Sequence, residues 1–412
     1  MKKLFFLFAS FLALNTGITS CSNDEDNQGQ GNKNNPRHSI NITQDEQEII
    51  DAHKSNAFKL LKSANENLKD NDTFVISPLS ASFALSMLVN GTADETLEAS
   101  MKELGLQRHT IEELNLTNTK LIDSLNLLDK RAIVEIANSM WINNGETPLD
   151  SYTSVIKDYY KGDVINKDFN EKETLNAINN WCSKATKGNI KEFISEVPSN
   201  MPILLINAIY FKAPWNKPFS KDKKGTFTTI SGEKQTVEYM STTKETAYYK
   251  NGKCVALPIS YGNNAFSLYI LLPNDGISVD ECIEDLASHY WIDDEENTYY
   301  ADATIKMPKF SIVSNNSILS SLESSGIRRC FAKDANYTNL FRTASYVATD
   351  ILQATTFVVD EEGTEASSST LVGGDLLIKF EKREFTVDHP FLFFVKEQSS
   401  GAILFAGKVG RI

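Results

Sequence analysis

The sequence predicts a mixed α+β fold over residues 43–412. Apolar strand candidates recur along this range, and residues 354–359 are a clear example. Ile50, Ala57 and Leu61 recur at helical spacing. Hydrophobic residues make up 41% of the chain, which is enough to bury a large core. Length alone would allow two or three domains, but no Pro-, Gly- or Ser-rich linker interrupts the range.

Residues 1–20 have the features of a secretory signal peptide: a basic start, a short apolar run and the closing sequence Ile18-Thr-Ser-Cys21. The run is too short for a comfortable membrane span. Its end resembles a bacterial lipobox, which implies that Cys21 becomes the lipidated first residue of the mature protein. The alternative is an ordinary signal peptide with an incidental cysteine.

Residues 21–42 are expected to form a lipidated, disordered tether, because the polar stretch 22–36 cannot bury a core. The acidic residues that follow Cys21 resemble the export tag of surface-displayed lipoproteins in some Gram-negative bacteria. We therefore expect an outer membrane lipoprotein, surface-exposed or periplasmic, that is held at the membrane through the lipid at Cys21.

The net charge limits the classes of partner, and the cysteine spacing limits the metal and redox chemistry. The formal charge of −13 argues against nucleic acid and against a polyanionic cofactor. The four cysteines beyond the tether show no C-x-x-C spacing for a metal or redox pair. Cys182 and Cys254 lie in apolar contexts and are expected to be packed thiols. Since an exported protein can carry disulfides, the state of all four stays open: Cys182, Cys254, Cys282 and Cys330.

The sequence carries no recognisable catalytic motif. None of its five histidines accompanies a G-x-S-x-G element, and His53 is expected at the polar edge of a helix. No H-E-x-x-H, Walker or dinucleotide-binding motif appears. The neighbouring carboxylates Glu361 and Glu362 would point to opposite faces of a strand and so would not converge on a substrate. We therefore expect no enzyme, no metal site and no cofactor.

The most informative segment is residues 360–372, which follow the strand candidate 354–359. Composition alone is typical of a flexible surface loop. The segment contains no proline, however, and in an extended conformation one face would carry only small, hydroxyl or branched apolar side chains. These are Thr364, Ala366, Ser368, Thr370 and Val372. Such a face could enter between two strands while Glu365 stays in solvent, so this loop could become a strand.

Blocks of sequence on both sides of this segment resemble the serpin family, in order and at the family's spacing, over about residues 43–412. The blocks are 74–80, 91–96, 180–190, 204–215 with 218–219, 307–310, 319–327, 361–366, 385–395 and 400–408. The resemblance implies that residues 43–412 form a single domain with an α+β serpin fold. This fold would have a large central mixed β-sheet, two further sheets, about nine helices and an exposed reactive-centre loop at about 361–384.

The same resemblance implies a function. A serpin offers its loop to a protease, and the cleaved loop then inserts into the central sheet while the protease is still attached as an acyl-enzyme. The hinge from which insertion starts corresponds here to Glu361, Glu362, Gly363, Thr364, Glu365, Ala366, Ser367, Ser368 and Ser369. The three serines stand where alanines are frequent in the family, and serine is small enough to enter.

Family spacing from Gly363 places the reactive bond at Leu377-Ile378. Counting back from Pro390 allows Lys379 instead, because that side of the loop varies in length. Leu377 would suit proteases with apolar pockets, of the chymotrypsin, subtilisin or papain type, and Lys379 would suit trypsin-like ones.

The family also has a polar cluster where its central sheet opens, and a tryptophan at the top of that sheet. The residues at matching positions are Ser77, Ser80, Asn207, Gln353 and Trp215. Gln353 stands where the family frequently has histidine, and glutamine cannot charge near neutral pH.

The resemblance thus implies an irreversible inhibitor of serine or cysteine proteases, expected to be a monomer whose partners are those proteases. The small, proline-free hinge favours this hypothesis. A non-inhibitory serpin that acts as a binding or structural surface lipoprotein is the alternative. A lipoprotein that binds a glycan or an adhesion partner is a remoter one.

Overall fold

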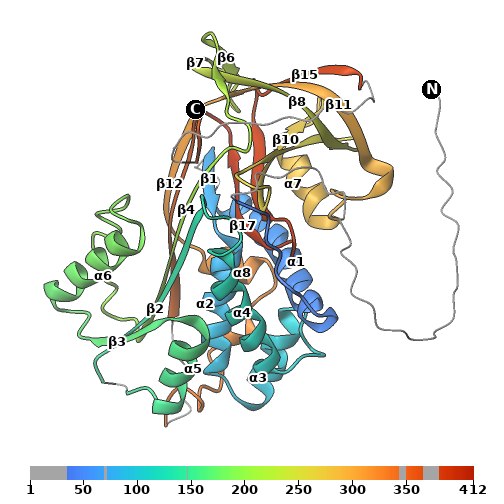
Figure 1. The fold of residues 1–412 in the computed structure, drawn as a ribbon. Helices are drawn as coiled ribbons and strands as arrows, with labels where there is room; N and C mark the ends of the chain where they lie inside the picture. The colour runs from blue at the N-terminus through green and yellow to red at the C-terminus, as the bar shows by residue number, and fades with distance from the viewer. Residues whose placement is uncertain (1–34, 69–71, 146, 343–348, 365–379) are drawn as a thin grey trace, which may run out of the picture.

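The computed structural model describes residues 35–68, 72–145, 147–342, 349–364 and 380–412 (Figure 1). Within these ranges, eight α-helices and three β-sheets form an α+β architecture. The predicted fold class is confirmed, with a mixed central sheet, two further sheets and eight α-helices against the nine or so expected.

Four of the eight α-helices in the described ranges begin at a side-chain cap, and the other four have none. Three begin at a capping box, in which a Ser or Thr side chain and a Glu three residues later bond each other's backbone N–H groups. The α-helices are α1 (Gln44–Asn67), α2 (Pro78–Asn90), α3 (Asp94–Glu103), α4 (Ile111–Leu125), α5 (Asp150–Tyr160), α6 (Lys172–Ala185), α7 (Val279–Ser288) and α8 (Leu319–Ser324). Two 3-10 helices span Glu295–Asn297 and Arg329–Phe331. None of the helices in the described ranges is long and apolar enough to cross a membrane.

The central sheet has six strands. Its main order is β12 (Phe310–Ser317), β13 (Thr349–Val359), β4 (Ile203–Pro214), β2 (Ile133–Asn143) and β3 (Asp163–Lys167), and the two-residue β14 (Gly363–Thr364) pairs with β4. β13 runs parallel to β4 and β2 runs parallel to β3, whereas the β12–β13 and β2–β4 pairs are antiparallel. The sheet is therefore mixed, as expected.

The largest sheet has nine strands, and a third sheet has two. The nine-stranded sheet follows the order β1 (Thr73–Ile76), β17 (Ile403–Val409), β16 (Phe391–Glu397), β10 (Phe266–Pro273), β9 (Cys254–Ser260), β8 (Tyr239–Lys250), β11 (Thr298–Pro308) and β15 (Lys382–Thr386), with β5 (Ser220–Lys221) on β8. β6 (Gly225–Thr228) and β7 (Lys234–Val237) form the small one.

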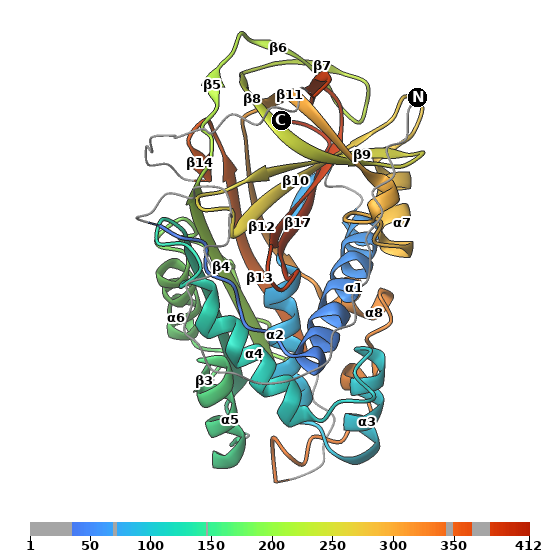
Figure 2. The same ribbon diagram turned by 45° about the vertical axis from the view of Figure 1, so that its right-hand side comes forward.

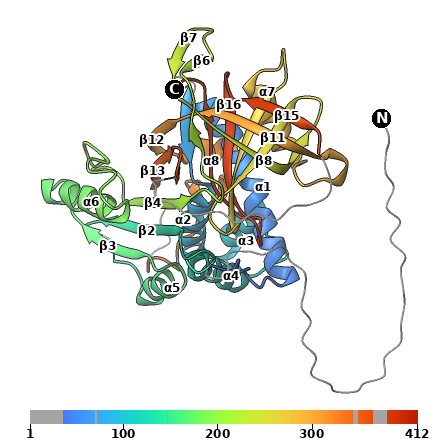
Figure 3. The ribbon, with the colours of Figure 1, turned by 45° about the horizontal axis from the view of Figure 1, so that its top comes forward.

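Strand β4 is buried on both faces of the central sheet. Ile203, Leu205 and Ile209 join the main core, which also contains residues of α1 and α2. Leu204 and Ile206 point the other way, into a second core with residues of α6. This alternation follows from the two-residue period of a strand. Figures 1 and 3 show α6 and β3 on the side of the molecule opposite to α7.

His53 on helix α1 is buried, with 5% of its surface exposed, so its expected place at a polar helix edge is wrong. The ring nitrogen Nε2 lies 3.0 Å from Oδ1 of Asn118 on α4. Helix α1 packs against α2, α4, α7 and α8, and this coverage closes the face that the sequence pattern left polar. Burial lowers the pKa of His53 to about 4.

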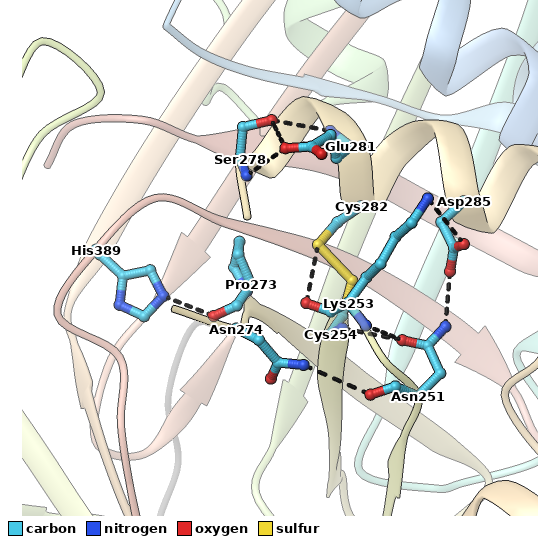
Figure 4. Close-up of a disulfide and its surroundings, with 10 residues drawn as sticks. All are labelled: Asn251, Lys253, Cys254, Pro273, Asn274, Ser278, Glu281, Cys282, Asp285 and His389. Atoms are coloured by element: carbon cyan, nitrogen blue, oxygen red, sulfur yellow. Dashed lines mark hydrogen bonds and ion pairs between the residues drawn. A yellow bond between two sulfur atoms is a disulfide. The ribbon is translucent and has the colours of Figure 1, made fainter. Parts of the chain in front are cut away.

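Cys254 and Cys282 form a disulfide between the start of β9 and helix α7 (Figure 4). The expectation that Cys254 is a packed thiol is therefore wrong, because the fold brings its Cα within 6.3 Å of that of Cys282. Cys182 and Cys330 are buried free thiols, and burial raises the pKa of both.

The described part of the N-terminal segment, from Asn35 onward, contacts the domain, although residues up to 42 were expected to be a tether. Asn35 is buried, and its Nδ2 donates to the buried carboxylate of Asp129 at 2.6 Å. The amide Nδ2 of Asn263 donates to the carbonyl of Pro36 at 3.0 Å. Ile40 is also buried. The chain is thus held against the domain from residue 35 onward.

Candidate functional site: the hinge and the opening of the central sheet

The central sheet opens between β13 and β4. Their parallel pairing runs from Thr349↔Ile203 to Thr355↔Ile209. Both strands continue beyond this point, β13 to Val359 and β4 to Pro214. The two central strands are therefore not paired with each other over about the last third of their length.

Strand β14 lies at the far end of that opening (Figure 2). It runs antiparallel to β4, with Gly363 opposite Pro214 and Thr364 opposite Ala213. A tight turn reverses the chain after β13: the N–H of Asp360 donates to the carbonyl of Gly363 at 3.0 Å. The hinge thus begins as a short strand, already directed back along the sheet.

The side chain of Asp360 holds this turn. Its Oδ1 accepts hydrogen bonds from the N–H groups of Glu362 at 2.9 Å and of Gly363 at 3.1 Å. Asp and Asn commonly stabilise turns by bonding backbone groups two residues on. The sequence pattern alone did not single out this residue.

Trp215 clamps the turn to the end of β4. Its backbone N–H donates to the carbonyl of Glu362 at 2.9 Å, and its indole Nε1 donates to the carbonyl of Asp360 at 2.8 Å. The indole is fully buried and stacks on Tyr261, with ring centroids 4.4 Å apart. Close by, the N–H of Phe219 donates to the carbonyl of Glu361 at 2.9 Å. A buried indole N–H normally requires such a partner.

Thr364 points into the core, on the face predicted from the alternation of the loop. It is 2% exposed, and its Oγ1 lies 2.8 Å from the hydroxyl of Tyr261. Burial raises the pKa of Tyr261, so this phenol stays protonated and remains a hydrogen-bonding group. Of the five residues predicted on the inward face, Thr364 is the one that the described ranges contain.

Position 363 requires glycine. A Cβ there would lie 2.2 Å from the carbonyl oxygen of Ala213 and 2.7 Å from the Cα of Pro214, and the backbone φ is +150°. No side chain fits at such distances without moving the backbone of β4. Gly363 therefore allows the hinge to approach β4 closely enough to pair with it.

The two glutamates of the hinge that the structure describes, Glu361 and Glu362, lie outside the core. Glu361 is half-buried, and Oε1 lies 3.4 Å from Nζ of Lys309, which also pairs with Glu238 at 2.6 Å. The hydrogen bond and charge of Glu238 raise the pKa of Lys309. Glu362 is exposed. Neither glutamate would have to be desolvated for the segment after them to enter the sheet.

A buried polar cluster lies at the middle of the sheet, where pairing of β13 with β4 approaches its end. Gln353 accepts from the N–H of Ser77 at 2.6 Å and donates to the Ser77 carbonyl at 2.9 Å. Its Nε2 also lies 3.4 Å from Oδ1 of Asn207, to which the Ser80 hydroxyl donates. The structure thus brings together four of the five residues that the family pattern singled out.

Asn138 is a fifth member that the sequence reasoning missed. It lies on β2 directly opposite Asn207, whose Nδ2 donates to its Oδ1. Its own Nδ2 is buried without a hydrogen-bond partner among the described residues. Trp215, the remaining predicted residue, lies at the end of β4, eight positions along the chain from Asn207, and belongs to the clamp.

Two further hydroxyls are buried without a partner at the point where the strands separate. They are Oγ1 of Thr355 and Oγ1 of Thr356, as far as the described residues show. Leaving such a group unsatisfied costs about 1–3 kcal/mol.

The rest of the predicted site lies outside the described residues: Cys21, Glu365, Ala366, Ser367, Ser368, Ser369, Leu377, Ile378 and Lys379. In the described ranges, no three His, Cys, Asp or Glu side chains gather as a metal site would require.

Comparisons with known proteins match most of the chain to one protein family. A family model described as "Serpin (serine protease inhibitor)" matches residues 51–412. An uncharacterized serpin-like protein of Methanosarcina mazei is 28% identical over 378 residues, which cover 88% of this chain and 87% of that protein. The leukocyte elastase inhibitor of Homo sapiens is 27% identical and covers 88% of this chain and 99% of its own length.

Solved structures agree with these matches. The thermophilic serpin tengpin in its native state superposes with a TM-score of 0.79 at 28% identity, covering 92% of this chain and 97% of tengpin. Thyroxine-binding globulin in complex with thyroxine has the same fold at 23% identity, with a TM-score of 0.74 over 89% of this chain and 98% of the globulin.

Proposed function

The chain belongs to the serpin family, and we propose that it is an irreversible suicide-substrate inhibitor of serine endopeptidases, with cysteine endopeptidases as a second target class. The observation that carries this proposal is the state of the hinge. Gly363 and Thr364 already pair with β4, at the top of an opening between β4 and β13. They are the first two residues of the strand that insertion would complete.

The groups that react with the loop are supplied by the target protease. Its serine or cysteine attacks the carbonyl carbon of Leu377, the bond to Ile378 breaks, and the new amine leaves with a proton. Leu377 then remains bound to the protease as an ester or thioester. Hydrolysis of that bond would release the protease, so trapping requires that insertion happens first.

Insertion is favourable because it extends β14 along the opening. Each new backbone hydrogen bond contributes about 1 kcal/mol net, and a full strand makes many of them. The small side chains at Ala366 and Ser368 would follow Thr364 into the core, while charged Glu365 would face the other way. As the strand lengthens, its far end carries the attached protease along the molecule.

We place the reactive bond at Leu377-Ile378, with Lys379 as the alternative. Mass spectrometry of the stalled complex tests this assignment. A new C-terminus at Leu377 supports it, and a break after Lys379 alone overturns it.

We further propose that the mature protein is an outer membrane lipoprotein, anchored by a lipid at Cys21 and acting as a monomer on proteases outside the cytoplasm. Metabolic labelling with a radioactive fatty acid should mark the wild type. The Cys21→Ser variant should be unlabelled, and equal labelling of both would overturn the lipid assignment.

A protease panel separates an inhibitor from a non-inhibitory serpin. The protein is mixed with chymotrypsin, subtilisin, elastase, trypsin and papain and run on a denaturing gel. An inhibitor gives a band of summed mass that withstands denaturation. If every protease only cleaves the loop and is released active, the protein is not an inhibitor of these classes. A rise in melting temperature after cleavage measures insertion independently.

A further inference from the structure

A hollow of about 150 Å³ lies beside the Trp215 clamp. Its walls come from the segment after β4 and from strands β8 and β9, and the residues that matter here are Asn216, Lys217, Thr242, Lys244, Glu245 and Ser260. This volume is large enough for water molecules or for one small ligand.

Two lysines line this hollow without a carboxylate partner. Nζ of Lys244 donates to the carbonyl of Pro258 at 3.0 Å, and Nζ of Lys217 donates to the carbonyl of Thr243 at 2.5 Å. An ammonium group has three donors, so each lysine has donors to spare. Among the described residues, no acidic side chain lies within 4.0 Å of either ammonium. Both side chains are half-buried.

The charge of the hollow is therefore not balanced locally. Burial and the neighbouring Lys217 lower the pKa of Lys244 to about 8. The carboxylate of Glu245 is the one acidic group in the described lining, and it is exposed. Two cations facing one enclosed space attract an anion more strongly than they would in open water, because the local dielectric constant is lower.

We propose that this hollow binds a small oxyanion, a phosphate or a compact carboxylate, between Lys217 and Lys244. Neutral donors complete the site. The hydroxyls of Thr242 and Ser260 and the amide of Asn216 belong to its lining and can bond the remaining anion oxygens.

The same wall connects the anion site to the hinge. The N–H of Asn216 donates to the carbonyl of Ser260 at 2.9 Å, and the preceding Trp215 bridges to Tyr261. Tyr261 contacts Thr364 of the hinge. An anion that tightens the wall would therefore also stiffen the clamp around β14.

Calorimetric titration with inorganic phosphate and with citrate, at constant ionic strength and pH 8, tests the proposal. The wild type should bind at least one of them. Lys244→Met and Lys217→Met should each lose about tenfold or more in affinity. Lys234→Met, which removes an exposed lysine on β7, is the matched control and should bind like the wild type. Glu245→Gln should bind more tightly, because it removes the opposing carboxylate.

The number of protons taken up on binding is a second measurement, which distinguishes an anion bound beside Lys244 from anions attracted only by the overall charge of exposed lysines. Burial and Lys217 lower the pKa of Lys244 to about 8, and a bound anion favours the charged form of the amine, so binding near this pH should be accompanied by proton uptake. Titration in two buffers of different ionisation enthalpy measures this uptake. Should either lysine variant misfold, Glu245→Gln still tests the location, since it changes the lining of the hollow without removing a lysine.

Two results would overturn the proposal. One is the absence of binding of both anions to the wild type. The other is binding that persists unchanged in both pocket variants, which would mean that the anions attach elsewhere. Neither result depends on whether the protein traps a protease.

Discussion

Substituting Thr364 by arginine tests whether the buried hinge residue controls the fate of the cleaved loop. Thr364 is 2% exposed and bonds the hydroxyl of Tyr261. An arginine there has no acidic partner, and burying an unpaired charge costs several kcal/mol. The arginine should therefore expel β14 from the core in the intact protein, so that insertion has to bury the charge. If about 2.7 kcal/mol of this cost is present in the transition state for insertion, insertion slows about a hundredfold.

The quantity that changes is the ratio of loops cleaved to proteases trapped. Suppose that insertion outruns hydrolysis of the acyl-enzyme about tenfold in the wild type. A hundredfold slower insertion then leaves hydrolysis about ten times faster, and roughly ten loops are cleaved for each protease that is trapped. The assay titrates a fixed amount of protease with inhibitor and follows both residual activity and the covalent band.

Glu362→Arg is the matched control, because it places the same charge on an exposed residue of the same hinge. It should trap nearly as well as the wild type. If Thr364→Arg also traps like the wild type, the argument from burial is refuted. If both variants fail equally, the added charge acts by some route other than burial at Thr364.

Three further predictions follow from features of the fold. Replacing Cys254 and Cys282 together by serine should lower the free energy of unfolding by about 3–4 kcal/mol, since their bridge closes a loop with a sequence separation of 28; denaturant unfolding that gives equal values for variant and wild type would contradict this. His53 has a pKa of about 4 in the fold, against 6.5 for a free histidine side chain, so the unfolded state binds the extra proton first. Stability is complete above pH 6.5 and should fall by up to about 3 kcal/mol as the pH drops from 6.5 to 4, a loss that His53→Gln should largely remove in urea titrations at both pH values. Gly363→Ala should release β14, because its Cβ would collide with the carbonyl of Ala213; hydrogen exchange at residue 364 should speed up, and unchanged protection would show that the close contact is not required.

Much of the central architecture could be predicted because the relevant signals are local. The strand candidate 354–359 is part of β13, and the alternation of small side chains correctly put Thr364 on the inward face. Both predictions depend on the two-residue period of side chains in an extended chain, and this period can be read directly from the order of the residues. The order of the family blocks supplied the rest of the topology.

What the sequence left undetermined depends on contacts between distant segments. Asn138 joins the polar cluster only because β2 pairs with β4 in one particular register. Cys254 meets Cys282 only because α7 packs against β10, the strand that pairs with β9. The same holds for His53, whose helical pattern looked amphipathic until other helices covered its polar edge. Register and packing of this kind have no local signature.

The short strand β14 also bears on self-association. An opening between two strands offers unpaired backbone groups to any extended peptide, including the loop of a second molecule, and such edges are sites of aggregation. In this protein Gly363 and Thr364 occupy the entrance, and Trp215 and Asp360 fasten them there. The clamp should therefore also hinder polymerisation, because it keeps residues of the same chain at the entrance of the opening. A variant in which Trp215 no longer holds the turn should polymerise on mild heating at a temperature well below its unfolding temperature.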